Sequence, residues 1–254
     1  MSVNALPDAP SASGADRAPV LRWLIFTGLS LFAAFLLWRY GLIRRMTDAD
    51  RTYISTVIVV LYICSSAHCF WRTLVIARES EGQRRTEMLL DDAGDGAADL
   101  IGGKAGVALP KSLTSDHIRD LARKAATQGE RRLDQTLLLR NLADRMRGSN
   151  SFGSFASDTL MKLGLLGTII GFIIMLAPIA GLDVSDKSVL KSSMGVMSDG
   201  MAVAMYTTLA GLVGSILLKI QYSILDGATA ALFGRVVRLT ETCVVPALER
   251  RYVR

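Results

Sequence analysis

Four long apolar stretches constrain the fold of this chain more than any other feature. A helix needs about 20 mostly apolar residues to cross a bilayer. The stretches approach that length and contain no Asp, Glu, Lys or Arg; they are residues 23–38, 52–71, 163–182 and 201–218. The sequence therefore predicts an all-α integral membrane protein with four transmembrane helices. The first stretch is the shortest, and no small-x-small cleavage site follows it, so we expect a retained helix rather than a signal peptide.

These stretches divide the chain into five segments. The N-terminal segment is rich in Pro, Ala, Ser and Asp and has no apolar period, which predicts a disordered tail. The predicted order is a disordered tail (1–19), transmembrane helices 1 and 2 (20–76), a cytoplasmic helical segment (77–157), transmembrane helices 3 and 4 (158–226) and a cytoplasmic C-terminal helix (227–254).

The distribution of Lys and Arg predicts the orientation. Four helices put the N-tail, the middle segment and the C-tail on one side, and this side holds most of the basic residues. Cytoplasmic segments carry an excess of Lys and Arg. We therefore expect a multi-pass protein of the bacterial inner membrane with both termini in the cytoplasm. The first short loop argues locally against this orientation, because it is basic and contains Arg44, Arg45 and Arg51.

The net charge of +6 fits this positive-inside pattern and attraction to anionic lipid better than nucleic-acid binding. The cysteines Cys64, Cys69 and Cys243 match no metal-ligand spacing, and we expect free thiols. With two histidines in the chain, we expect no metal site and no cofactor. No nucleophile–base set or phosphate loop is visible, so we expect no enzyme and no catalytic residues.

The segments outside the membrane read mainly as helices. Residues 72–90 can prolong the second membrane helix, whereas the Gly- and Asp-rich residues 91–106 predict a loop. Ser112 or Ser115 can cap a helix over residues 116–127, which Gly129 ends. A second helix over residues 130–147 would place Leu133, Leu137, Leu138, Leu142 and Met146 on one face. The C-terminal segment predicts a helix up to Pro246 that packs beside the middle segment, with Leu232, Val236, Leu239 and Val244 as its apolar positions.

Small residues recur on the last two spans at helical spacing. The third span has one small side, and the fourth has two rows with a spacing of four. Such rows let membrane helices approach closely, because van der Waals packing drives their association in lipid. The partners can be each other, further copies or another chain. The third-span residues are Gly164, Gly167, Thr168 and Gly171, and the fourth-span rows are Gly200, Ala204 and Thr208, and Thr207, Gly211 and Ser215.

The threonines Thr168, Thr207 and Thr208 are the candidate ion-pathway residues. A Thr hydroxyl in a membrane helix can bond back to the carbonyl four residues earlier. Three threonines beside small residues can instead form an uncharged polar lining that binds water or Na⁺, but they do not titrate near neutral pH. Ion paths in membranes usually carry an ionisable residue, and these two spans have none at depth. A carboxylate for such a path would come from a different chain.

The run "LGLLGTIIGF" at residues 163–172, followed by "GMAVAMYTTLAGLVGS" at residues 200–215, resembles the MotA/TolQ/ExbB family of stator-type ion-channel subunits. The order of two helices, a cytoplasmic segment, two helices and a tail is similar to MotA. The adjacent threonines resemble sodium-type MotA relatives. ExbB and TolQ carry a Glu five residues before the fourth-helix threonine, and this chain has Val203 there.

The resemblance implies a mechanism. Five copies would surround a dimer of a single-span partner of the MotB, ExbD or TolR type, whose membrane helix bears an Asp. Flow of H⁺ or Na⁺ past that Asp would rotate the pentamer and deliver mechanical work. Thr168 and Thr208 would lie near the partner Asp, with Thr207 as a neighbour, and Pro178 would kink the third helix.

Two alternatives belong to other classes. A structural membrane scaffold would use the small rows for packing only and would conduct no ions. A stand-alone channel or transporter is disfavoured because no intramembrane charge and no pair of broken helices is visible.

Overall fold

The computed structural model describes residues 18–39, 41, 53–101, 110–128, 133–148, 151–181 and 187–252. These residues form helices and short connections, with no strand among them, and this confirms the predicted all-α class. Residues 1–17 of the predicted N-tail, most of the first short loop and Gly129 lie outside the described residues, whereas residues 18 and 19 of that predicted tail are helical.

The chain folds as two compact units. Unit 1 comprises residues 1–22, 72–149 and 225–254, and unit 2 comprises residues 23–71 and 150–224. Two long helices contribute to both units: α3 (Ile54–Ala93) and α8 (Lys187–Leu239). Since α3 runs unbroken to Ala93, the prediction that residues 72–90 prolong the second apolar stretch is confirmed.

Unit 2 contains the apolar stretches. Within the described part of the chain, three helical runs are long and apolar enough to cross a membrane, and they include the first part of α3, most of α7 (Ser151–Leu176) and the first part of α8. In α1 (Ala18–Arg39) the apolar stretch Trp23–Leu36 is shorter. These helices make the chain an integral membrane protein. The role of α1 as the first span stays a prediction.

Within unit 2, α1 packs on α3 and α8. The Trp23 ring stacks on Phe70 with centroids 4.7 Å apart. The Gln221 amide of α8 is fully buried, with Nε2 3.4 Å from Thr27 Oγ1 of α1 and 3.5 Å from Tyr62 OH of α3. A buried amide in an apolar bundle costs free energy without such partners. This polar contact therefore favours α1 at this one place on the pair.

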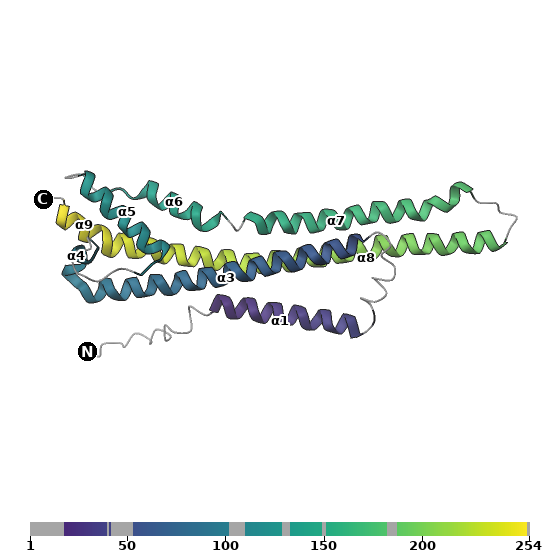
Figure 1. Cartoon of the computed structure of the whole chain (residues 1–254), viewed down its shortest axis with the longest axis horizontal. Coiled ribbons are helices and arrows are strands. Elements are labelled where there is room, and N and C mark those ends of the chain that lie inside the picture. The colour runs from purple at the N-terminus through teal and green to yellow at the C-terminus, as the bar shows by residue number, and fades with distance from the viewer. Residues whose placement is uncertain are drawn as a thin grey trace, which may run out of the picture. The chain divides into compact units, whose positions relative to one another are not determined.

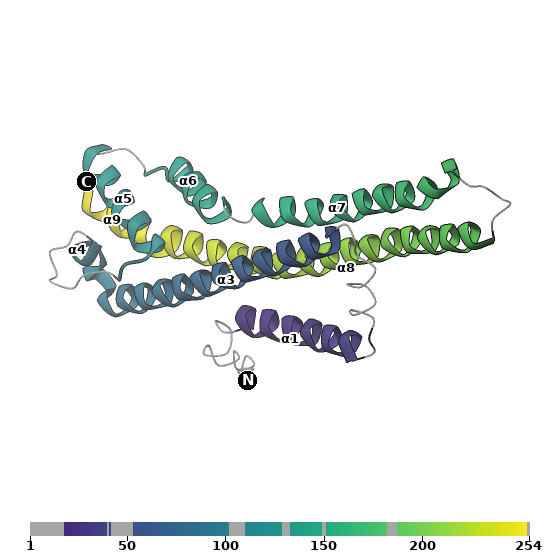
Figure 2. The same cartoon turned by 45° about the vertical axis from the view of Figure 1, so that its right-hand side comes forward.

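Unit 1 has its own apolar core. It joins the end of α3, α4 (Ala97–Ile101), α5 (Leu113–Gln128) and α9 (Val245–Tyr252), which gather together in Figure 2. Fully or nearly fully buried members are Leu90, Leu100, Ile118, Leu121, Leu133, Leu239, Val244 and Leu248. The predicted packing of the C-terminal segment beside the middle segment is confirmed. The predicted loop after residue 90 is partly wrong, since α3 continues to Ala93 and a 3₁₀ turn, η1 (Gly94–Gly96), leads into α4.

Ser112 caps α5, as one of the two sequence alternatives predicts. Its Oγ accepts a hydrogen bond from the Ser115 backbone N at 3.2 Å. The Glu79 carboxylate of α3 accepts another from the Leu113 backbone N at 2.9 Å. These contacts satisfy amide groups that have no partner inside the helix. They also attach the start of α5 to α3.

The second predicted helix begins later than the sequence indicates. The helix α6 spans Thr136–Arg147, and Asp134 fixes a turn before it by accepting hydrogen bonds from Thr136 N at 2.9 Å and Thr136 Oγ1 at 2.6 Å. Short Asp side chains favour such turns over helix. The predicted apolar face is therefore wrong at Leu137, which is 74% exposed, while Leu142 and Met146 are buried.

The C-terminal helix continues past Pro246. A proline ring inside a regular α-helix clashes with the carbonyl four residues earlier. Here a π-helical turn, η3 (Thr240–Val244), widens the helix just before that position, and the Val245 N–H bonds to the Thr240 carbonyl. The predicted end at Pro246 is wrong because a widened turn accommodates a proline.

His117 of α5 makes the stability of unit 1 depend on pH. It is 5% exposed, and burial lowers its pKa below the ordinary 6.5, against weaker opposing effects of Gln135 and Asp120. The unfolded chain therefore binds a proton near pH 6.5 that the folded chain binds only at lower pH. The stabilising contribution is complete above pH 6.5 and is lost as the pH falls through the folded pKa, by at most about 1.4 kcal/mol per pH unit.

We expect His117→Gln to flatten the dependence of unfolding free energy on pH between 7 and 5.5. Denaturant unfolding of the purified chain at several pH values measures this, and His68 is retained in both proteins. Equal slopes for the two proteins would contradict the assignment to His117.

Candidate functional site

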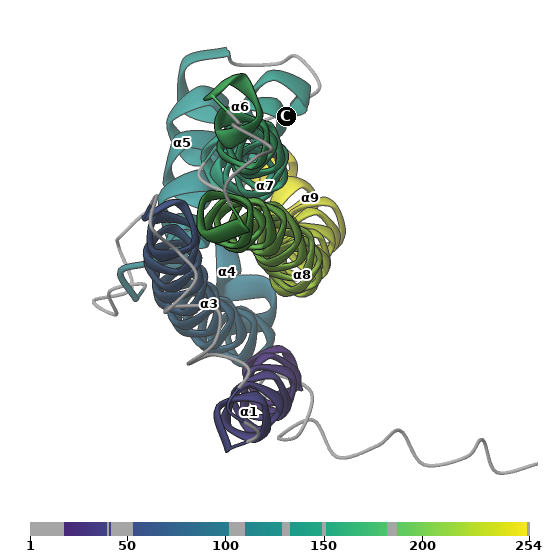
Figure 3. The ribbon, with the colours of Figure 1, turned by 90° about the vertical axis from the view of Figure 1, so that its right-hand side faces the viewer.

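The contact between α7 and α8 is the centre of unit 2. The two helices run side by side in Figures 1 and 3. Their small residues meet. A Cβ added to Gly211 would lie 2.7 Å from Gly164 Cα and 2.8 Å from the Leu160 carbonyl oxygen. A Cβ added to Gly200 would lie 2.5 Å from Met175 N and 2.8 Å from the Gly171 carbonyl oxygen. Backbone therefore meets backbone along this contact.

The remaining predicted packing residues lie on the same contact. Gly167 faces the Thr207 side chain directly, and a Cβ added to Gly171 would lie 2.6 Å from the Ala204 N. At the other end, Ser157 Oγ lies 3.0 Å from Ser215 Oγ and 3.0 Å from the Ser215 carbonyl oxygen. The structure thus brings together all seven residues of the predicted packing set, and the partner of each row is the other helix of the same chain.

Ser157, which belongs to this contact, has no place in the sequence prediction. Gly153, Ala156, Ser157 and Leu160 are buried on α7. They extend the row of Gly164, Gly167 and Gly171 by about three turns in steps of three and four, so the same spacing argument could have found them. A Cβ at Gly153 would occupy the Tyr222 ring.

Thr207 is fully buried in the contact. Its Oγ1 donates to the Val203 carbonyl at 2.8 Å and lies 3.2 Å from the Ala204 carbonyl. A hydroxyl used in this way satisfies the helix that carries it. Since no part of Thr207 is exposed, its side chain fills the space over Gly167.

Thr168 and Thr208 are half-buried at the same helix pair. Thr168 Oγ1 donates to the Leu165 carbonyl. Thr208 Oγ1 donates to the Ala204 carbonyl at 2.9 Å and lies 3.3 Å from the Gly164 carbonyl of α7. Each hydroxyl proton is thus directed to a helix carbonyl, while the oxygen keeps acceptor capacity on a partly open side. Of the three threonines, these two keep a partly exposed side chain.

The outward faces of α7 and α8 are apolar. A soluble protein rarely exposes such a continuous apolar surface. These side chains are therefore suited to contact lipid or other membrane helices. They include Leu165, Ile169, Phe172, Ile173 and Leu176 on α7, and Met201, Met205, Leu209, Leu212 and Ile216 on α8.

A polar contact lies further along α8, between α3 and α8. His68 Nδ1 is 2.8 Å from Tyr222 OH, and Tyr222 OH is 3.4 Å from the Ser65 carbonyl. The His68 ring also meets Phe152 edge-on at 5.1 Å. These contacts give His68 a structural place in unit 2.

Pro178 lies beyond the α-helical part of the third span. α7 ends at Leu176, and Pro178 belongs to a 3₁₀ segment, η2 (Ala177–Gly181). A proline removes a helix hydrogen bond and disfavours helix at the residue before it. In this structure Pro178 lies at the end of α7 and not at a bend in its middle.

Val203, where ExbB and TolQ carry Glu, is buried at 2% exposure.

One comparison with known proteins gives a match that covers this helix pair. The model of the MotA/TolQ/ExbB proton channel family matches residues 105–236, a little over half of the chain, including α7 and most of α8. The chain belongs to the MotA/TolQ/ExbB proton channel family. No curated protein and no solved structure gives a significant match. Among the described residues, no group of three His, Cys, Asp or Glu side chains is placed to hold a metal ion.

We expect Gly211→Ala to destabilise unit 2. The added methyl must displace Gly164 or the Leu160 carbonyl, and overpacking of this kind costs about 1–3 kcal/mol. Thermal unfolding of the detergent-solubilised chain should shift to lower temperature.

Gly195→Ala is the matched control on the same helix. An added Cβ there meets nothing within 4 Å, and alanine favours helix by about 1 kcal/mol over glycine. Equal behaviour of the two variants would show that the α7–α8 contact is looser than described.

Proposed function

We propose that this chain is the ion-conducting subunit of a stator-type complex, in which flow of H⁺ or Na⁺ across the membrane drives mechanical work by rotation. The observation that carries the proposal is the pair of half-buried threonines, Thr168 and Thr208, on a tightly packed pair of membrane helices. Family membership supports the same function. The complex would contain five copies around a dimer of a single-span partner of the MotB, ExbD or TolR type.

The partner would supply the titratable group. Among the described residues, the α7–α8 contact itself buries glycine residues, small or apolar side chains and threonine and serine hydroxyls, and it buries no charge. Hydroxyl oxygens can coordinate a cation or hold water, but they do not carry a proton by titrating near neutral pH. An Asp on the partner helix would complete the path, since intramembrane carboxylates mark ion pathways.

The α7–α8 pairs of the five copies would together form a wall around the partner, with one pair from each copy. The backbone-to-backbone contact would keep the two helices together while the wall moves past the partner carboxylate. Thr168 and Thr208 would stabilise the ion or its water as it passes. The apolar outer residues would face neighbouring copies and lipid.

The location follows from the same proposal. The complex would lie in the bacterial inner membrane, with both termini and unit 1 in the cytoplasm. The end of the α7–α8 pair that carries η2 and Lys187, here named the connection end, would then face the periplasm.

A structural scaffold is the second candidate, and one observation favours it. All three threonine hydroxyls donate to carbonyls of their own helices, which is the use expected of a Thr with no ion to bind. A scaffold would assemble through the same helix contact and conduct no ions.

Thr208→Val tests the proposed ion path. The substitution keeps the shape of the side chain and removes the oxygen on the open side. We expect normal assembly and at least about tenfold lower ion flux, since losing one ligand or hydrogen bond to an ion costs about 1.5–3 kcal/mol. Flux is measured in vesicles holding the chain and its partner, with a pH-sensitive dye and with ²²Na⁺.

Thr159→Val is the matched control. Thr159 also donates to a carbonyl of its own helix, at 2.7 Å to Phe155, but lies nearer the start of α7. Flux equal to wild type in both variants, at equal expression, would remove Thr208 from the path.

A further inference from the structure

Asp199 occupies a position on α8 that the proposed function does not use. We consider the part of α7 and α8 that runs from Gly164 and Gly211 to the connection end. Among its described residues, Asp199 carries the sole carboxylate. It lies two residues before the predicted fourth span, which begins at Met201. From sequence alone it therefore falls in the loop outside the membrane.

The packing of α7 on α8 places Asp199 deeper than that. The neighbouring Gly200 fits against Met175 N and the Gly171 carbonyl of α7, so Asp199 lies level with about Met175. Beyond Met175, α7 and η2 continue through Leu176–Gly181 without a charged residue. That is about 10 Å of further apolar chain. The carboxylate of one helix thus lies alongside the apolar stretch of the other.

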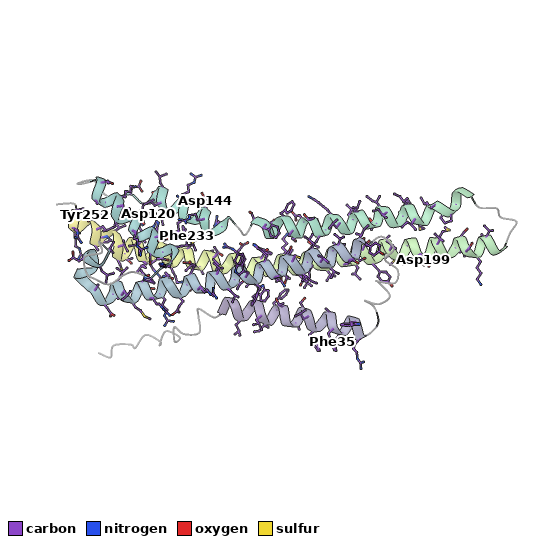
Figure 4. All side chains as sticks on the ribbon, in the orientation of Figure 1. Phe35, Asp120, Asp144, Asp199, Phe233 and Tyr252 are labelled. Carbon is purple, nitrogen blue, oxygen red and sulfur yellow. The ribbon has the colours of Figure 1, made fainter. Side chains whose placement is uncertain are left out.

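The Asp199 side chain is exposed on α8, where it is labelled in Figure 4. The residues one turn away from it on α8 are Gly195, Val196, Ala202 and Val203, and none of them is charged. An ionisable side chain at such a depth faces a water-filled cavity or another protein group rather than lipid, because its burial in hydrocarbon is costly. This level of α8 therefore borders water or protein.

We propose that Asp199 lies at the water-filled mouth of the ion path at its connection end, where its carboxylate concentrates the transported monovalent cation. The inference rests on the proposed function and adds an entry residue to it. Tyr206 lies seven residues further on, two turns along the same face of α8, and is half-buried.

Thiol labelling tests the mouth without requiring ion flow. The free cysteines Cys64, Cys69 and Cys243 are first replaced, and Ala202→Cys, one turn inward from Asp199, becomes the reporter. The complex in its native membrane is treated with a cationic and an anionic methanethiosulfonate reagent. Gly195→Cys, one turn outward in open space, is the reference for reaction from water.

We expect the Ala202→Cys thiol to react from water and to prefer the cationic reagent. Asp199→Asn should lower the ratio of cationic to anionic rates by up to about tenfold, since one charge about 6 Å away in water changes each reagent's local concentration about threefold in opposite directions. Asp199→Glu should restore the ratio. Asp158→Asn, which removes an exposed carboxylate on α7, should leave it unchanged.

Two results would overturn the proposal. One is an Ala202→Cys thiol that does not react while Gly195→Cys does, which would place Asp199 above a closed surface. The other is a rate ratio that Asp199→Asn does not change.

Ion flux then separates this proposal from the proposed function. If the chain conducts, Asp199→Asn should raise the half-saturating cation concentration several-fold and leave the maximal flux unchanged, with rescue by Glu. If no flux is found for any form of the complex, the proposed function fails, and the labelling ratio still reports whether the mouth exists. A lower maximal flux with an unchanged half-saturating concentration would assign Asp199 to a later step and contradict an entry role.

Discussion

The backbone contact between α7 and α8 is the constraint on which the rest of unit 2 depends. In lipid, apolar side chains gain little from meeting each other, so helices associate where small residues allow close packing. Gly164, Gly200 and Gly211 provide that approach, and a single added methyl at Gly211 would meet backbone atoms within 3 Å. The contact fixes the register of the two helices. The register in turn sets the depth of every polar group on them.

This register explains how a helix contact that buries no charge can serve a proton channel family. The Thr207 side chain is buried against Gly167, whereas the side chains of Thr168 and Thr208 are partly exposed. In the proposed function, the chain would offer hydroxyl oxygens along a rigid wall and leave the titratable step to another chain. A rigid wall with a separate carboxylate is suited to a mechanism in which one component moves past the other.

Local patterns in the sequence predicted much of this structure, and longer-range contacts account for the rest. The apolar stretches gave the membrane class, and the small rows at Gly164 and Gly200 indicated where helices would meet. Periodicity did not reveal that Asp134 starts a turn before α6 or that a π turn carries the helix past Pro246. Nor could it place Asp199 beside Met175, because the depth of a residue depends on the register between two helices and not on the window around it.

The central claim is that this chain builds an ion-conducting assembly with a second, carboxylate-bearing chain. Native mass spectrometry of the tagged protein, gently extracted from its own membranes, tests this most directly. The account predicts a pentamer carrying two copies of a single-span protein with an Asp in its membrane helix. A homo-oligomer without a second protein, reproduced in several mild detergents, would contradict it, because the proposed path would then have no titratable group at its centre.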